Sequence, residues 1–323
     1  MSEHAQLSPS GSARWLACPG SYWLSQEAPA QPESKAATEG TDAHDWAAKI
    51  LLGELDYIDN PYAGIELYVE RVRTSASRKG AQLWVEKRVF LTDEIHGTPD
   101  ATISYKRELD VFDLKYGYNK VEAMNNSQLI IYAGAAIKTY NLKPTKVNMF
   151  IAQPRAGGIR AVSVPIKIFD ASLNTILKAA DDLLANPDSP RRAGAHCQYC
   201  PAATICPERK DEAKRMADIA FRSVKEIDEQ TMVWAIENKK RIVDWFDQLG
   251  EFALTKPPTG YAVVQGQGKR VWRTDIEVPM IAKAMTLSEA EKAGYKLDDL
   301  TIKKPGPLTL VKKETSSDSF PDL

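Results

Sequence analysis

Hydrophobic and polar positions follow two rhythms along this chain. Ala43, Trp46, Ala47 and Ile50 fall on one helical face, which predicts a helix over Thr38–Leu52. Short runs rich in β-branched and aromatic residues, separated by turn-like stretches, predict strands instead. The same two patterns give the remaining elements: helices over 65–79, 127–140, 169–185 and most of 208–250, and strands over 82–90, 98–105, 109–115, 146–153 and 159–164.

The order of these elements predicts the fold class. It reads helix, three strands, helix, two strands, helix, which predicts an α/β protein with a mixed sheet flanked by helices. We expect this core over residues 1–210 and a mainly helical extension over 211–311. Within the extension, Tyr261–Val264 and Arg270–Arg273 flank QGQGK and predict a β-hairpin. Residues 312–323 have the polar composition of a disordered tail.

Composition narrows the class of protein only slightly. The 323 residues carry 42 Lys and Arg against 43 Asp and Glu, for a formal net charge of −1. This balance gives no sign of a nucleic-acid binder, although it leaves room for a local basic groove. No apolar run approaches the ~18 residues of a membrane span, and the polar N-terminus lacks the apolar core of a signal peptide. We therefore expect a soluble, cytoplasmic protein with no membrane partner.

Four cysteines are the first chemical clue. Cys197, Cys200 and Cys206 lie close together, whereas Cys18 is 179 positions before Cys197. In a reducing compartment such a cluster favours metal binding over disulfides, and four thiolates suit either zinc or a 4Fe–4S cluster. His196 could replace one thiolate in a zinc site, leaving Cys18 over. The alternative is that Cys18 is a small buried residue and the others form a loop cluster.

Two aspartates and a lysine are the second clue. Asp100 follows Gly97 in GTPD, and Asp113 precedes Lys115 in DLK. Alternate residues of a strand share a face, so Asp113 and Lys115 point the same way. If the two strands are neighbours, the carboxylates can share Mg²⁺ or Mn²⁺, and the lysine can activate a water or offset phosphate charge. The competing interpretation is a structural Asp–Lys pair on a sheet edge.

Further polar residues lie around these positions in the sequence. His44 is inside the first helix, where it is either a surface residue or a metal ligand. Glu86 precedes Asp100 by one strand, as a further ligand or a solvent-facing charge. Gln128 and Tyr132 are four apart and share a helix face, which suits contact with a phosphate or base, or packing against the sheet.

Taken together, these motifs resemble the PD-(D/E)XK nuclease superfamily in its RecB-like branch. The pieces run in family order as RWLACPGS, EGTDAH, GTPD, DLKYG, NSQLIIYA and CQYC. The cysteines resemble the iron–sulfur staple of AddB and of RecB-like nucleases of CRISPR adaptation, where one cysteine precedes the core and three follow it. The order is also similar to a phage and prophage family catalogued only as a domain of unknown function. The resemblance covers roughly residues 8–210.

The resemblance implies a restriction-endonuclease-like core and a set of site roles. The catalytic residues would be Asp100, Asp113, Lys115, Glu86, Gln128 and Tyr132. The metal, Mg²⁺ or Mn²⁺, would be bound by His44, Asp100, Asp113 and the Leu114 carbonyl. A structural 4Fe–4S cluster, with Zn²⁺ as the alternative, would be held by Cys18, Cys197, Cys200 and Cys206. The DNA contacts would be Gln128, Tyr132, Arg88 and Arg71.

The function implied is that of a divalent-metal-dependent deoxyribonuclease. We expect an exonuclease on single-stranded DNA or DNA ends, in phage recombination or DNA processing, in the cytoplasm of a bacterial host. A phage recombinase or single-strand-binding protein is a candidate partner. Trp15, Tyr22, Trp23 and Tyr116 are candidates for stacking on unpaired bases. The alternative function is a catalytically silent DNA-binding or recombinase-partner module with a structural zinc or iron–sulfur site.

Overall fold

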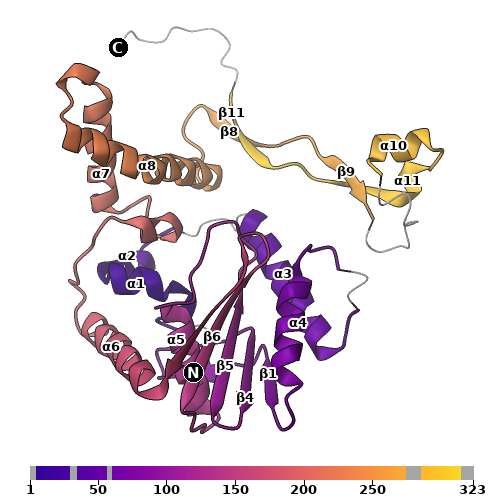
Figure 1. Ribbon diagram of the computed structural model, residues 1–323. Coiled ribbons are helices and arrows are strands. Elements are labelled where there is room, and N and C mark those ends of the chain that lie inside the picture. Colours follow the sequence, from indigo (N-terminus) through magenta and orange to yellow (C-terminus); the bar gives the residue numbers. More distant parts are fainter. Residues whose placement is uncertain (1–4, 30–34, 57–59, 274–284, 314–323) are drawn as a thin grey trace. The chain divides into compact units, whose positions relative to one another are not determined.

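The computed structural model describes residues 5–29, 35–56, 60–273 and 285–313 (Figure 1). The chain divides into a first unit of residues 1–245 and a second unit of residues 246–323. The boundary between these units lies inside helix α8, Glu229–Thr255.

A five-stranded mixed sheet is the centre of the first unit, as the sequence predicts. Its strand order is β1-β4-β5-β6-β7, and only β5 and β6 run parallel among these described strands. Two further short strands, β2 and β3, form a separate antiparallel pair. The bounds are β1 Gln82–Val85, β2 Val89–Phe90, β3 His96–Gly97, β4 Ala101–Tyr105, β5 Glu108–Leu114, β6 Lys146–Gln153 and β7 Gly158–Pro165.

Helices cover both faces of this sheet (Figure 1). Alternation along β5 divides its side chains between two cores. Leu109 and Val111 pack with α5 and α6, while Phe112 and Leu114 pack with α3 and α4. These helices span α3 Lys35–Leu52, α4 Ile65–Ala76, α5 Ser127–Thr139 and α6 Ile166–Leu184.

The N-terminal segment joins the core beside α5. It comprises a short 3-10 turn, η1 Pro9–Gly11, followed by α1 Ser12–Ala17 and α2 Gly20–Gln26. Trp15 is buried and donates from Nε1 to the Ser8 carbonyl at 3.1 Å, and Trp23 donates to the Leu183 carbonyl at 3.2 Å. Both indoles therefore fix this segment to the core, and the stacking role suggested for Trp15 is wrong because its ring is inaccessible.

Two helices replace the single long helix predicted over most of 208–250. A short turn, η3 Ala195–Tyr199, is followed by α7 Pro207–Ala220, η4 Val224–Glu226 and α8. Asp228 separates the helices because its side chain accepts a hydrogen bond from the Thr231 amide at 2.8 Å, which caps the start of α8. α7 and α8 are joined by the buried Glu212 carboxylate, which accepts bonds from Arg209 and Arg241.

The second unit corrects the predicted hairpin. β8 Tyr261–Gln265 pairs with β11 Leu308–Lys312, and β9 Lys269–Trp272 pairs with β10 Thr301–Lys304, so β8 and β9 are consecutive but not paired. Two short helices, α10 Leu287–Lys292 and α11 Leu297–Leu300, belong to the same unit. The predicted tail begins at 312, but Lys312 ends β11, and 314–323 lie outside the described residues.

The glycines of QGQGK explain why no hairpin turn forms there. Neither Gly266 nor Gly268, both of which the structure describes, has the positive φ that tight hairpin turns require. Each instead lies against the opposite strand. A Cβ on Gly268 would come within 2.3 Å of the Lys304 carbonyl oxygen, and Gly266 donates its amide to the Pro307 carbonyl at 2.8 Å. The glycines thus allow close backbone approach rather than chain reversal.

Among the described helices, none has the length and apolar character needed to cross a bilayer.

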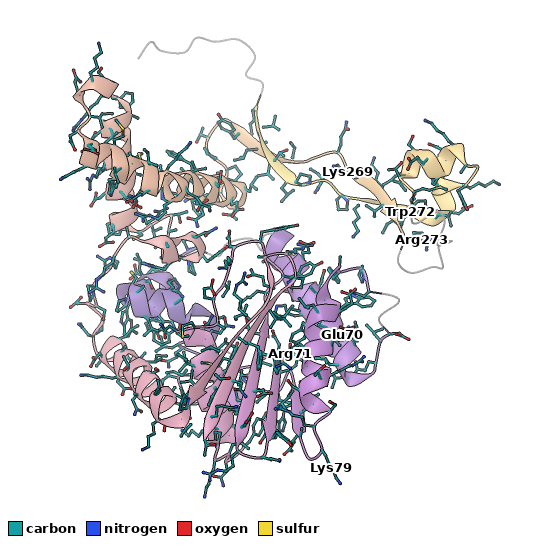
Figure 2. The ribbon with its side chains drawn as sticks, viewed as in Figure 1. Glu70, Arg71, Lys79, Lys269, Trp272 and Arg273 are labelled. Carbon is teal, nitrogen blue, oxygen red and sulfur yellow. The ribbon has the colours of Figure 1, made fainter. Side chains whose placement is uncertain are left out.

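A buried ion pair in this core gives a stability prediction. Asp110 is 2% exposed and pairs with Arg78 at 2.5 Å, while Lys79, next along the chain, is exposed (Figure 2). Arg78→Ala should lower the free energy of unfolding by about 3 kcal/mol, because it leaves a buried carboxylate without its cation. Lys79→Ala should change it by less than about 0.5 kcal/mol. Urea denaturation of both variants makes the comparison; equal effects would contradict it.

Candidate catalytic site

Two aspartates meet at one end of the central strands. Ala101 of β4 pairs with Phe112 of β5, so the next positions outward, Asp100 and Asp113, come opposite each other. Both residues are buried. The condition that the sequence left open, that the two strands are neighbours, is therefore met.

Asp100 links three elements of the core. Its Oδ1 lies 3.0 Å from Nδ1 of His44 on α3, and its Oδ2 accepts the backbone amide of Leu114 at 2.5 Å. The carboxylate itself sits at the start of β4. Its position is therefore set by a helix on one side and by the neighbouring strand on the other.

Asp113 belongs to a second network of hydrogen bonds, which it forms with Gln128 and Lys115. Gln128 Nε2 donates to Asp113 Oδ1 at 2.8 Å, and Lys115 Nζ donates to Gln128 Oε1 at 3.0 Å. Lys115 Nζ also lies 2.9 Å from Asp113 Oδ2, but this buried oxygen receives no hydrogen bond of normal geometry from any residue that the structure describes. The three side chains form a closed ring that leaves one carboxylate oxygen with acceptor capacity.

The protonation of the site reflects its burial and its crowded charge. Burial, together with the nearby Asp100, raises the pKa of Asp113 to about 6, although Lys115 acts in the opposite direction. Glu86 is exposed at the surface, but partial desolvation of its carboxylate, together with the nearby Asp100, raises its pKa to about 8. Burial disfavours the imidazolium of His44, yet the Asp100 carboxylate outweighs this effect and raises the His44 pKa to about 9. Without a cation, protons on these side chains offset the negative charge of the carboxylates, as a bound cation would otherwise do.

Glu86 reaches the site through an unusual backbone conformation. Its φ is +47°, which ends β1 and interrupts the strand predicted over 82–90, while its amide still donates to the Asp100 carbonyl at 3.1 Å. Non-glycine residues adopt this region at a cost, and such residues concentrate at functional sites. The side chain is thereby placed near His44 and Asp100, in a position that strand alternation does not predict.

The donor chemistry of these residues matches a cation site. Within the described part of the chain, His44, Glu86 and Asp100 are the one group of three His, Cys, Asp or Glu side chains whose ligand atoms lie within 4.8 Å of one another. Carboxylate oxygens with one imidazole suit Mg²⁺ or Mn²⁺. Asp113 lies outside this group of three, although its charge still influences the pKa of His44. The residues present therefore fit a divalent cation.

Tyr132 of α5 and Arg88 line a second cavity. Tyr132 is one helical turn from Gln128 and lines a cavity of about 400 Å³ together with Arg88 and His96. Burial raises the pKa of the Tyr132 hydroxyl further above its usual value, so it remains protonated. Arg88 Nη2 lies 3.3 Å from His96 Nδ1.

Arg71 lies away from these residues. It belongs to α4, where its guanidinium lies 4.6 Å from the Phe150 ring centroid and donates to Ser75 Oγ at 2.9 Å (Figure 2). The structure places it in the packing of α4 against the sheet, not beside the carboxylates.

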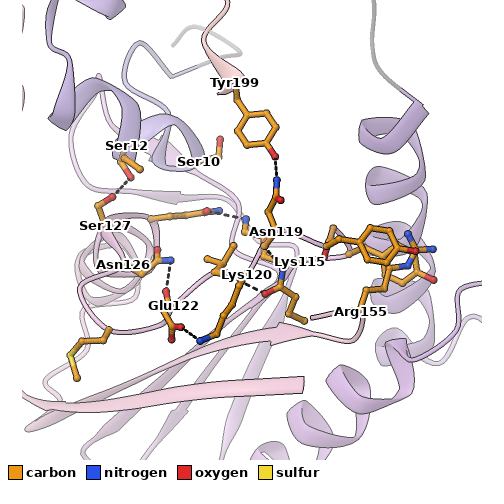
Figure 3. A pocket seen from close by; sticks show the side chains of 18 of the residues that line it. Ser10, Ser12, Lys115, Asn119, Lys120, Glu122, Asn126, Ser127, Arg155 and Tyr199 are labelled. Atoms are coloured by element: carbon orange, nitrogen blue, oxygen red, sulfur yellow. Dashed lines mark hydrogen bonds and ion pairs between the residues drawn. The ribbon is translucent and has the colours of Figure 1, made fainter. Parts of the chain in front are cut away.

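A cavity of about 900 Å³ opens beside Lys115 and Gln128 (Figure 3). The sequence did not single out several of its lining residues. Tyr118 and Asn119 come from the loop after β5, and Tyr199 comes from the cysteine segment. Tyr116, the predicted stacking residue, is instead buried, with the Arg155 guanidinium 3.7 Å from its ring centroid.

The four cysteines converge on one small cavity. Cys18, Cys197, Cys200 and Cys206 are all described, all buried, and none forms a disulfide. Backbone amides of Arg192 and Gly194 donate to Cys18 and Cys197 Sγ at 3.2 and 3.3 Å. The fold thus brings Cys18 into the same cavity as Cys197, which lies 179 positions later in the sequence.

His196 and three arginines also line this cavity. Hydrogen bonds to Cys18 and Cys197 raise the pKa of His196 to about 10. Arg191, Arg192 and Arg209 lie around the thiols. Two of these guanidinium groups are paired with carboxylates, Arg191 with Glu208 and Arg209 with Glu212.

Comparison with known proteins identifies the family of the chain. A family described as "Protein of unknown function (DUF2800)" matches residues 4–67 and 56–305, and the chain belongs to it. A solved structure titled "Crystal structure of SSO0001" is 17% identical, over 65% of this chain and 89% of that chain, with a TM-score of 0.33. A likeness of that size supports no inference about fold or function.

The pKa values at the site predict pH-dependent cation binding. Glu86 and His44 hold protons at pH 7 in the absence of a cation, and binding must release them. Affinity for Mg²⁺ should therefore rise as pH increases from 7 to 9, by up to about tenfold per pH unit for each proton released.

Isothermal titration at several pH values measures this slope. Glu86→Gln should weaken Mg²⁺ binding and flatten the slope near pH 8, because one of the two protons is no longer exchanged. Glu70→Gln, an exposed position on α4, serves as the control and should leave both unchanged. An affinity independent of pH across this range would contradict the prediction.

Proposed function

We propose that this member of the DUF2800 family is a divalent-metal-dependent DNA nuclease with a PD-(D/E)XK, RecB-like core. The observation that carries the proposal is the opposition of Asp100 and Asp113 at the end of paired strands, with Lys115 directed at Asp113. Both carboxylates are buried beside an open cavity lined by Lys115. A purely structural Asp–Lys pair needs neither the second aspartate nor the nearby His44.

The residues divide into cation ligands and groups that act on the phosphodiester. The ligands for Mg²⁺ or Mn²⁺ would be His44, Glu86 and Asp100, whose ligand atoms lie within 4.8 Å of one another, and the resemblance adds Asp113 and the Leu114 carbonyl. When bound, such an ion polarises a phosphoryl oxygen and lowers the pKa of a coordinated water. The Leu114 amide and His44 hold Asp100 in place for this role from opposite sides.

Lys115 is the group we assign to the attacking water. Its ammonium is held between Asp113 and the Gln128 carbonyl oxygen, which fixes its direction before substrate arrives. From there it would position the water and offset negative charge that develops on the phosphate. Gln128 and Tyr132 would contact the DNA strand, and Arg88 would contact a phosphate.

We further propose that the four cysteines hold a structural 4Fe–4S cluster. In a tetrahedral zinc site with Zn–S near 2.3 Å, the sulfurs lie about 3.8 Å apart. No three thiols among the described residues come within 4.8 Å of one another, although all four line one cavity. The preference for the cluster over zinc comes from the resemblance of the cysteine order to the iron–sulfur staple of RecB-like nucleases, and the amide bonds to Cys18 and Cys197 are of the kind that tune cluster sulfurs.

The biological setting is proposed from the sequence resemblance alone. It favours an exonuclease on single-stranded DNA or DNA ends, in phage recombination or DNA processing in a bacterial host. A recombinase or single-strand-binding protein would be the partner in that setting.

Lys115→Ala and Asp113→Asn test the catalytic assignment. Each should reduce Mg²⁺- or Mn²⁺-dependent degradation of end-labelled DNA by at least about 10²-fold, because Lys115→Ala removes the cation that offsets phosphate charge and Asp113→Asn removes a charged cation ligand. Lys79→Ala, at an exposed position, is the control and should retain wild-type activity. Full activity in Lys115→Ala would defeat the assignment. Binding of DNA without cleavage under either ion would instead favour a silent binding module.

Purification without air tests the cluster. The protein should be coloured, with about four iron and four sulfide per chain, and Cys18→Ser should lose the visible absorption because the fourth thiolate is missing. A colourless protein with stoichiometric zinc would overturn the iron–sulfur proposal and leave the catalytic one untouched.

A further inference from the structure

Two cavities are lined by residues close to the carboxylate site, although neither is lined by Asp100 or Asp113 themselves. The larger, of about 900 Å³, is lined by Lys115 and Gln128, and the smaller, of about 400 Å³, by Tyr132 and Arg88. Gln128 and Tyr132 are one turn apart on α5, and Ser10 lines both cavities. The two cavities therefore adjoin at Ser10, and the larger one reaches Lys115, which pairs with Asp113.

The larger cavity carries two accessible aromatic rings. Tyr118 and Tyr199 are each 74% exposed, although they come from segments far apart in the sequence. The Tyr199 side chain is restrained by a hydrogen bond, because Asn119 Nδ2 donates to its hydroxyl at 2.7 Å (Figure 3). Exposed aromatic faces held beside one cavity are what base stacking requires.

The loop that carries Tyr118 and Asn119 is held by hydrogen bonds to the buried side chain of Gln153. Gln153 is 1% exposed, and its Nε2 donates to the carbonyls of Gly117 and Asn119 at 3.1 and 2.7 Å. Its Oε1 accepts the Val121 amide at 3.0 Å. One buried amide thus sets the loop conformation, so the rings are arranged before any ligand binds.

The charges around this cavity are largely compensated. Arg155 forms a two-point ion pair with Glu39 at 2.8 and 2.6 Å, and Lys120 pairs with Glu122 at 2.6 Å. The remaining lining is rich in amides and hydroxyls, which match base edges and sugars better than they match a dense phosphate array. This lining favours an unpaired strand over the backbone of a duplex.

The smaller cavity has a different character. Arg88 lines it together with the imidazole of His96, and the Arg88 guanidinium lies 5.9 Å from the Phe90 ring centroid. A guanidinium in this position suits a single phosphate. The larger cavity thus offers two stacking surfaces, and the smaller cavity offers a cation.

We propose that these cavities form a binding groove for one unpaired DNA strand, in which bases stack on Tyr118 and Tyr199 and a backbone phosphate contacts Arg88. This inference rests on the proposed nuclease function and deepens it by naming the strand form and its contacts. Selection of single-stranded substrate then arises from the two tyrosines rather than from the carboxylate site.

Binding measured without divalent cations tests the groove separately from catalysis. Fluorescence anisotropy in EDTA compares a labelled oligothymidylate of about twelve nucleotides with a hairpin duplex of similar length. Tyr118→Ala and Tyr199→Ala should each raise the Kd for the single strand by about tenfold, with a larger loss in the double variant. Binding of the duplex should change little.

Two controls separate stacking from other effects. Tyr199→Phe keeps the ring and loses the bond from Asn119, so it should retain most of the affinity. Tyr261→Ala removes an exposed tyrosine from β8 in the second unit and should retain all of it.

The outcomes separate this inference from the proposed function. Wild-type affinity in both alanine variants, equal losses for single strand and duplex, or no single-strand binding by the wild type would overturn the groove. If the wild type cleaves DNA while the tyrosine variants bind normally, the groove alone fails. If the tyrosines hold the strand but no cleavage occurs with Mg²⁺ or Mn²⁺, the nuclease proposal fails and the groove stands.

Discussion

The hydrogen bonds of the Asp100 carboxylate are the constraint on which the site depends. One oxygen faces His44 on α3, and the other accepts the Leu114 amide of β5. A buried carboxylate is costly unless it is paired, and here the pairing draws on a helix and a neighbouring strand at once. The arrangement therefore exists only when the sheet and its covering helix have both formed. The function we propose is built on that junction between two layers of the fold.

The two buried aspartates of strand β5, Asp110 and Asp113, differ in how completely their carboxylates are hydrogen-bonded. Asp110 and Asp113 lie on opposite faces, because their positions differ by an odd number. Asp110 is satisfied by Arg78 at 2.5 Å and Asn148 at 2.7 Å, as a structural charge should be. Asp113 has one oxygen without a hydrogen bond of normal geometry among the described residues, and burial raises its pKa to about 6. Incomplete satisfaction beside a cavity, rather than burial alone, distinguishes the candidate ligand.

Local periodicity predicted much of the core and part of the site. Alternation placed Asp113 and Lys115 on one face, and the element order predicted the mixed sheet between helices. Features set by backbone conformation or long-range packing were not predictable in this way. Glu86 enters the site because its backbone φ is positive. The QGQGK glycines allow a neighbouring backbone to approach closely, although the same sequence is also typical of a turn. Tyr116 and Tyr118 look alike in sequence, yet only the fold buries one under Arg155.

The two proposed sites share one short segment of chain. Tyr199 lies between Cys197 and Cys200, so the loop that presents thiols to one cavity also presents an aromatic ring to the other. The backbone of that loop is tied by the Gly194 amide to Cys197 Sγ, and its outer edge by Asn119 to the Tyr199 hydroxyl. On the proposals above, a cluster bound by these cysteines would fix the loop and, through it, the position of the stacking ring. A structural staple would then support strand binding without taking part in the chemistry.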